Sequence, residues 1–150
     1  MRHSRHDLGR GMRWLLILCG PMNLAGAICF APPFPAGRQL LGLPEAPPLY
    51  LWILSSWVLA FGVAYLLQGW SGRASRGVLA VGAWGKAVFG AVLLAQSATG
   101  DLPWQAGAAA VPDLLLAAVF VVWLWRSRAV APAVGLSCAP DRRAGDRVDA

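Results

Sequence analysis

Residues 49–70 form a mainly apolar stretch that contains no charged side chain. A helix needs about 20 apolar residues to cross the hydrocarbon core of a bilayer, so a stretch of this length is typical of a membrane span. Three further stretches follow the same pattern. They are residues 14–32, residues 77–97, interrupted only by Lys86, and residues 103–125, interrupted only by Asp113.

These stretches predict an all-α protein, an integral membrane four-helix bundle whose helices run antiparallel, up and down. The expected helices cover approximately residues 12–32, 49–70, 77–97 and 103–126, within one transmembrane domain of residues 1–128. Residues 129–150 are rich in alanine, proline and mixed charges and show no apolar periodicity. We expect them to form a disordered cytoplasmic tail.

Composition argues against a soluble protein. Hydrophobic residues make up 57% of the chain and charged residues only 13%, whereas about a quarter of the residues in an average soluble domain are charged. The net charge of +6 would suit a nucleic-acid-binding protein, but the basic residues lie in short flanks between apolar stretches. The expected partner is therefore the lipid bilayer and not nucleic acid.

The basic flanks predict the orientation, because arginine and lysine near the ends of spans are retained in the cytoplasm. Basic residues gather before the first span, between the second and third, and after the fourth, whereas Arg38 is the only one in the two other loops. They are Arg2, Arg5, Arg10, Arg13, Arg73, Arg76, Arg126 and Arg128. Both termini are therefore expected inside. Aromatic side chains near the span ends agree: Trp14, Trp70, Trp123 and Trp125 inside, and Tyr50, Trp52 and Trp104 outside.

The first stretch also resembles a signal peptide, with a small-residue cleavage motif at residues 25–27. We favour a retained span, because the apolar character continues through Phe30. The following loop, residues 31–48, is rich in proline and cannot be a regular helix throughout. Residues 37–43 could still form one amphipathic turn on the membrane surface.

Lys86 and Asp113 would each cost about 2.5–3.5 kcal/mol at the centre of a membrane helix, so each needs a partner. A tight turn near Thr99 and Gly100 would fold the last two helices antiparallel and bring the two charges level. Small neighbours would allow close approach. They are Gly82 and Gly90 around Lys86, and Ala109 and Ala117 around Asp113. We favour an ion pair that fixes helix register over a proton relay or a substrate counter-ion, because no second carboxylate or histidine extends it.

Other polar side chains within the spans could line a small polar cavity. The candidates are Asn23, Ser55, Ser56, Tyr65 and Gln68. Such groups more often form hydrogen bonds with neighbouring helices or with the backbone, and we favour that interpretation.

No cofactor or metal site is predicted. His3 and His6, the only histidines, lie in the basic amino-terminal segment, which excludes bis-histidine haem ligation within the spans. Cys19 and Cys29 share one expected helix at about 15 Å separation, beyond the reach of a disulfide. Cys138 lies in the tail, and no C-x-x-C or hydrolase motif occurs.

Five short segments stand out along the chain: residues 30–34 (FAPPF) and 42–44 (GLP) in the first loop, residues 61–65 (FGVAY), residues 85–86 (GK) and residues 112–114 (PDL). Taken together, they resemble an uncharacterised family of small four-helix bacterial inner-membrane proteins. The resemblance covers approximately residues 14–126. It implies the same four-helix topology and no particular activity.

The leading hypothesis is a non-catalytic accessory or interaction subunit that forms a homo-oligomer or binds another membrane protein. A small transporter or channel component using Lys86 and Asp113 is the main alternative, because solute sites often lie near the membrane midplane. A membrane enzyme acting on a lipid or quinone is the second, although no convincing nucleophile and base are evident. The residue usage resembles that of GC-rich bacterial genomes, so we expect the bacterial inner (cytoplasmic) membrane.

Overall fold

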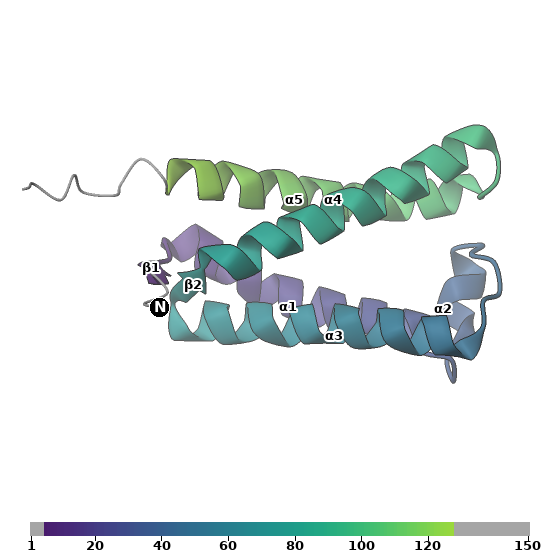
Figure 1. Cartoon of the computed structure of the whole chain (residues 1–150), viewed down its shortest axis with the longest axis horizontal. Coiled ribbons are helices and arrows are strands. Elements are labelled where there is room, and N and C mark those ends of the chain that lie inside the picture. Colours follow the sequence, from purple (N-terminus) through teal and green to yellow (C-terminus); the bar gives the residue numbers. More distant parts are fainter. Residues whose placement is uncertain (1–4, 128–150) are drawn as a thin grey trace, which may run out of the picture.

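The computed structural model describes residues 5–127 and consists mainly of four long helices (Figure 1). They are α1 (Arg10–Phe30), α3 (Pro48–Ser71), α4 (Arg76–Thr99) and α5 (Trp104–Arg126). Each is long and apolar enough to cross a membrane. The expected number of long apolar helices is confirmed, and their bounds lie close to those expected. The expected tail, residues 129–150, lies outside the described residues.

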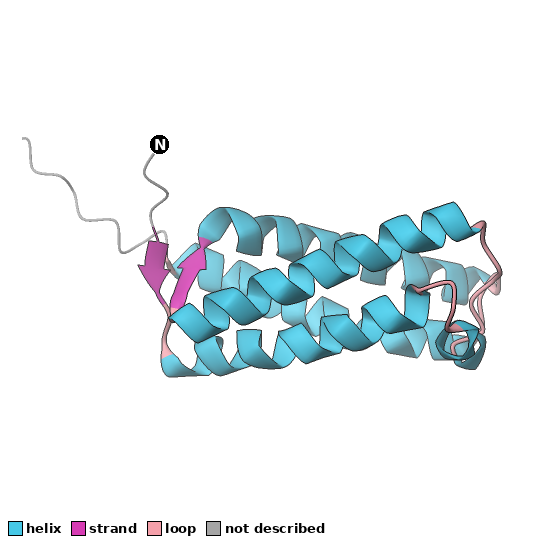
Figure 2. Ribbon diagram, turned by 90° about the horizontal axis from the view of Figure 1, so that it is seen from below, coloured by secondary structure: helices cyan, strands magenta, loops and turns pink. Residues whose placement is uncertain are grey.

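Two short strands add an element that the sequence did not indicate. Strand β1 (Arg5–Asp7) pairs antiparallel with β2 (Arg73–Ser75), which directly precedes α4. Figure 2 shows the strands at one end of the bundle and the short helix α2 (Pro35–Leu40) at the other. The chain is mostly helical, as expected, and these strands were not predicted because three residues are too few to leave a periodic pattern in the sequence.

The long helices form two hairpins, α1 with α3 and α4 with α5. Close backbone contacts are concentrated within each hairpin. Figure 1 shows α4 next to the end of α3 at the strands and increasingly distant from it toward the α2 end. The turn of the second hairpin is the expected one: Gly100 ends α4 in the left-handed conformation (φ 86°), which glycine adopts without steric cost.

Arginine side chains close the carboxyl ends of three helices. Arg13 donates to the carbonyls of Gly69 and Trp70 at the end of α3, and Arg76 donates to the carbonyl of Leu124 near the end of α5. Arg38 on α2 donates from Nη1 to three carbonyls, those of Cys29, Phe30 and Ala31. These cations complement the negative ends of the helix dipoles. The expected amphipathic turn after the first span is therefore α2, which begins slightly earlier than predicted.

A buried core fills the end of the bundle that carries the strands. Its members come from all four long helices and from β2: Leu16, Cys19, Tyr65, Ala74, Leu79, Ala83 and Phe120. The rings of Tyr65 and Phe120 meet edge to face at 5.4 Å and connect α3 with α5. This core holds the two hairpins together at one end.

Candidate functional site

Lys86 and Asp113 form an ion pair between α4 and α5, the contact expected from the hairpin register. Each lies near the midpoint of its helix, and Lys86 is buried. The two helices approach closely beside the pair, because a Cβ atom at Gly90 would lie 3.4 Å from the backbone carbonyl oxygen of Ala110 and 2.7 Å from the side chain of Leu114. Gly82 has a different role from the one expected. It leaves space for the hydroxyl of Tyr65 on α3.

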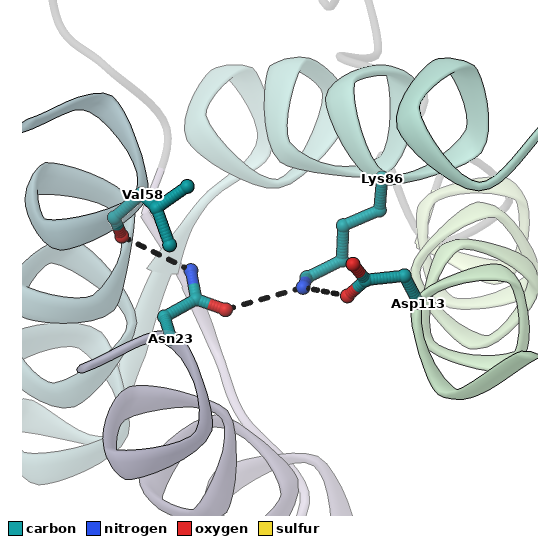
Figure 3. A network of polar contacts seen from close by, with 4 residues as sticks. All are labelled: Asn23, Val58, Lys86 and Asp113. Carbon is teal, nitrogen blue, oxygen red and sulfur yellow. Dashed lines mark hydrogen bonds and ion pairs between the residues drawn. The ribbon is translucent and has the colours of Figure 1, made fainter. Parts of the chain in front are cut away.

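Asn23 extends the ion pair into a polar chain that crosses all four long helices (Figure 3). Lys86 Nζ donates to Asn23 Oδ1 at 3.2 Å, and Asn23 Nδ2 donates to the carbonyl oxygen of Val58 at 3.3 Å. The chain thus runs from α5 through α4 and α1 to α3. Opposite charges cancel within it, and a buried ammonium obtains two acceptors, as a charge removed from water requires.

A cavity of about 410 Å³ lies beside this polar chain, between the two hairpins. All four long helices contribute to its wall. Most of the lining is apolar, and aromatic rings are prominent among it: Phe30, Trp57, Phe61 and Phe89. The polar side chains that reach it are Asn23, Tyr65, Lys86 and Asp113. The site therefore combines apolar walls with one polar side at the middle of the bundle.

The structure brings together only part of the expected polar cavity. Asn23 and Tyr65 line the cavity, whereas Ser56 and Gln68 do not. Ser56 is exposed on the outer face of α3. Gln68 Oε1 accepts a hydrogen bond from the backbone N–H of Ser75, at the start of α4. The possible polar cavity therefore does not include these two residues, because helical periodicity places them on other faces or at another level. Gln68 follows the favoured alternative, since both of its hydrogen bonds are to backbone groups.

Ser55 follows the alternative that we favoured for polar groups in spans. Its buried hydroxyl donates to the carbonyl oxygen of Ala27 at 2.7 Å and thereby connects α3 with α1. Its neighbour Ser56 points elsewhere, since adjacent helical residues face directions about 100° apart. Ser55 is therefore part of the packing within the first hairpin, outside the cavity lining.

The described residues offer no group of three or more histidine, cysteine or acidic side chains that could hold a metal ion. Cys19 and Cys29 are free thiols. His3 and Cys138 lie outside the described residues.

Sequence reasoning missed the contact between Asn23 and Lys86 and the aromatic wall of the cavity. One signal was present: Asn23, Val58, Lys86 and Asp113 each lie near the middle of their apolar stretches, so four antiparallel helices place them at one level. Which helix faces which was not encoded in that pattern, since it depends on the packing of the two hairpins. Comparison with known protein families, curated proteins and solved structures finds no match for this chain.

Proposed function

We propose that this chain is a multi-pass protein of the bacterial inner membrane, with both termini cytoplasmic, and that it acts as a non-catalytic accessory or interaction subunit. The observation that carries this proposal is the polar chain from Asp113 through Lys86 and Asn23 to the Val58 carbonyl. Its charges neutralise each other, and it joins both hairpins. Such a self-satisfied network suits a device that fixes one arrangement of helices.

The surface supports a membrane location. Large apolar side chains are exposed along all four long helices, as expected where lipid takes the place of water. Exposed aromatic residues lie near both ends: Trp14, Trp70 and Trp125 at the strand end, and Tyr50, Trp52 and Trp104 at the α2 end. This distribution resembles the two aromatic belts of membrane proteins. The basic flanks at the strand end support a cytoplasmic position for that end.

Orientation is tested by labelling single cysteines in a chain whose native cysteines are replaced by alanine. Leu40→Cys lies on α2, where Leu40 is 80% exposed, and Ser71→Cys lies exposed at the end of α3. An impermeant maleimide added to intact spheroplasts should label the first variant, and should label the second only after the membrane is permeabilised. The reverse pattern would overturn the orientation.

The accessory role is tested by purifying the tagged chain in mild detergent and crosslinking it beforehand in the membrane. A stoichiometric membrane protein or a second copy of the chain should be recovered. Replacing Lys86 and Asp113 by methionine and leucine together should leave that assembly intact, since the charges act inside the subunit. A purified monomer that is crosslinked to nothing would contradict the proposal.

A transporter or channel component is the second candidate, favoured by the cavity that reaches both Lys86 and Asp113. Intramembrane charges beside a cavity commonly mark solute pathways. Proton and solute flux into liposomes would distinguish the two candidates. Flux above that of empty liposomes, abolished in the Lys86→Met/Asp113→Leu variant, would support transport. Flux equal to that of empty liposomes would support the accessory role.

A further inference from the structure

We infer that the cavity between the hairpins is a binding site for an uncharged, lipophilic ring compound that bears a carbonyl oxygen, the chemistry of a quinone ring. This inference goes beyond the accessory role. The cavity volume of about 410 Å³ falls within the range of about 300–1,000 Å³ that small-molecule sites occupy. A cavity at the lower end of that range suits one compact molecule.

The charge of the lining selects an uncharged ligand. Lys86 and Asp113 are the only charged side chains among the lining residues, and they neutralise each other. An anion would have to compete with the carboxylate for the ammonium, and a cation would have to displace the ammonium from the carboxylate. Both changes would leave a buried charge without its partner, which is costly in an apolar setting. A neutral molecule avoids that cost.

The aromatic lining selects a ring. Trp57 and Phe61 lie on α3 with their rings stacked at 6.3 Å and 28° between the ring planes, and Phe30 and Phe89 meet edge to face at 5.9 Å across α1 and α4. Aromatic side chains from both hairpins thus line one cavity. A flat ligand can offer its faces and edges to such groups, which favours stacked and edge-to-face geometry.

The polar anchor is Tyr65, whose side chain lines the cavity while only 1% of its surface is exposed. Its hydroxyl lies against Gly82 on α4. A carbonyl oxygen in the cavity would accept a hydrogen bond from this hydroxyl. Lys86 Nζ, which uses two of its three donors within the polar chain, offers a second anchor.

The cavity also has a side entrance. Trp57 on α3 is 62% exposed although it lines the cavity, and Gly85 on α4 is an exposed lining residue. Both lie midway along their helices, where Figure 1 shows α4 diverging from α3. In the proposed membrane orientation this opening faces the hydrocarbon, so a lipophilic ligand would enter from the bilayer.

The test uses the full chain in nanodiscs and a pair of probes with nearly the same shape. Duroquinone carries two ring carbonyls, and durene is the corresponding hydrocarbon. Binding is measured by equilibrium dialysis, and protein-free nanodiscs give the background from partition into lipid. We expect saturable binding of duroquinone. Durene and a ring-methylated benzoate anion should each bind at least about tenfold more weakly. Equal binding of durene, or preference for the benzoate, would overturn the assignment.

Two variants locate the site. Gly85→Leu should abolish saturable binding, because Gly85 lines the cavity at its exposed side and a Cβ there meets nothing within 4 Å, which leaves room for a leucine side chain to narrow the entrance. Gly77→Leu is the matched control: it lies on α4 outside the lining, with only Ser75 Oγ near its Cβ, at 3.9 Å. Tyr65→Phe should weaken binding about tenfold without lowering the melting temperature. Unchanged binding in Gly85→Leu would overturn the proposal.

Discussion

The two hairpins have the same outline but satisfy their buried polar groups in different ways. In the first hairpin, Ser55 and Asn23 donate to the backbone carbonyls of Ala27 and Val58, so all the groups involved are uncharged. In the second hairpin, Lys86 and Asp113 form an ion pair. Neutral side chains can lose a partner at the cost of one hydrogen bond, whereas a buried charge cannot. The second hairpin therefore depends on its two charges far more than the first depends on its polar residues.

The largest effect is expected from Asp113→Leu, which leaves the buried Lys86 with Asn23 as its one described acceptor. Breaking a buried pair in this way costs about 3–5 kcal/mol, so the folded yield and melting temperature should fall sharply. The double variant Lys86→Met/Asp113→Leu should recover most of the loss, because no unpaired charge remains. Thermal unfolding in detergent measures both.

Ser55→Ala provides the control in the first hairpin, with an expected cost of about 1 kcal/mol. If Asp113→Leu lowers stability no more than Ser55→Ala does, the second hairpin does not depend on its charges more than the first depends on its polar residues. If the double variant is as unstable as the single one, the loss comes from packing and not from an unpaired charge.

The next effect concerns how closely each pair of helices approaches. A Cβ at Gly69 on α3 would lie 3.0 Å from the backbone nitrogen of Ile17 and 3.1 Å from the carbonyl oxygen of Arg13. At Gly90 the nearest obstacle is the side chain of Leu114, which can change rotamer. Gly69→Ala should therefore cost about 1–3 kcal/mol through backbone displacement, and Gly90→Ala should cost less.

Gly85→Ala is a suitable reference for both glycine variants, because nothing lies near its Cβ and alanine favours the helix by up to about 1 kcal/mol. It should raise the melting temperature slightly. Equal losses of stability in Gly69→Ala and Gly90→Ala would show that both hairpins tolerate an added methyl group equally well.

The sequence predicted the features that depend on one helix or on one short turn. Length and apolarity predicted the four helices, and the spacing of Lys86 and Asp113 around a single turn predicted their contact. The position of Asn23 depends on how two separate hairpins meet, and the pattern of residues 72–75, which connect them, does not predict that geometry. Ser55 and Ser56 were indistinguishable as residue types, and only the orientation of α3 decides which one is buried.

Asn23 allows the link between the hairpins to be measured separately from each hairpin. Asn23→Ala removes the hydrogen bonds to Lys86 and to Val58, with an expected cost of about 1–2 kcal/mol. In a double-mutant cycle with Lys86→Met, Asn23→Ala should be non-additive by at least about 0.5 kcal/mol, whereas Ser55→Ala should be additive. If the stability losses of Asn23→Ala and Lys86→Met simply add, the contact between Asn23 and Lys86 contributes nothing to stability.

The smallest expected effects lie at the strand end, where each hairpin carries an arginine on a helix carboxyl terminus. Arg13 donates to Gly69 from an exposed position, and Arg76 donates to Leu124 and to Ser127 Oγ from a partly buried one. Replacing either by glutamine should cost about 0.5–1 kcal/mol. Salt screens exposed charges more than buried ones, so the loss at Arg13 should shrink between low and high salt while the loss at Arg76 persists. Melting temperatures at two salt concentrations measure the difference, and an equal salt response at both arginines would mean that these two ends of the hairpins are alike.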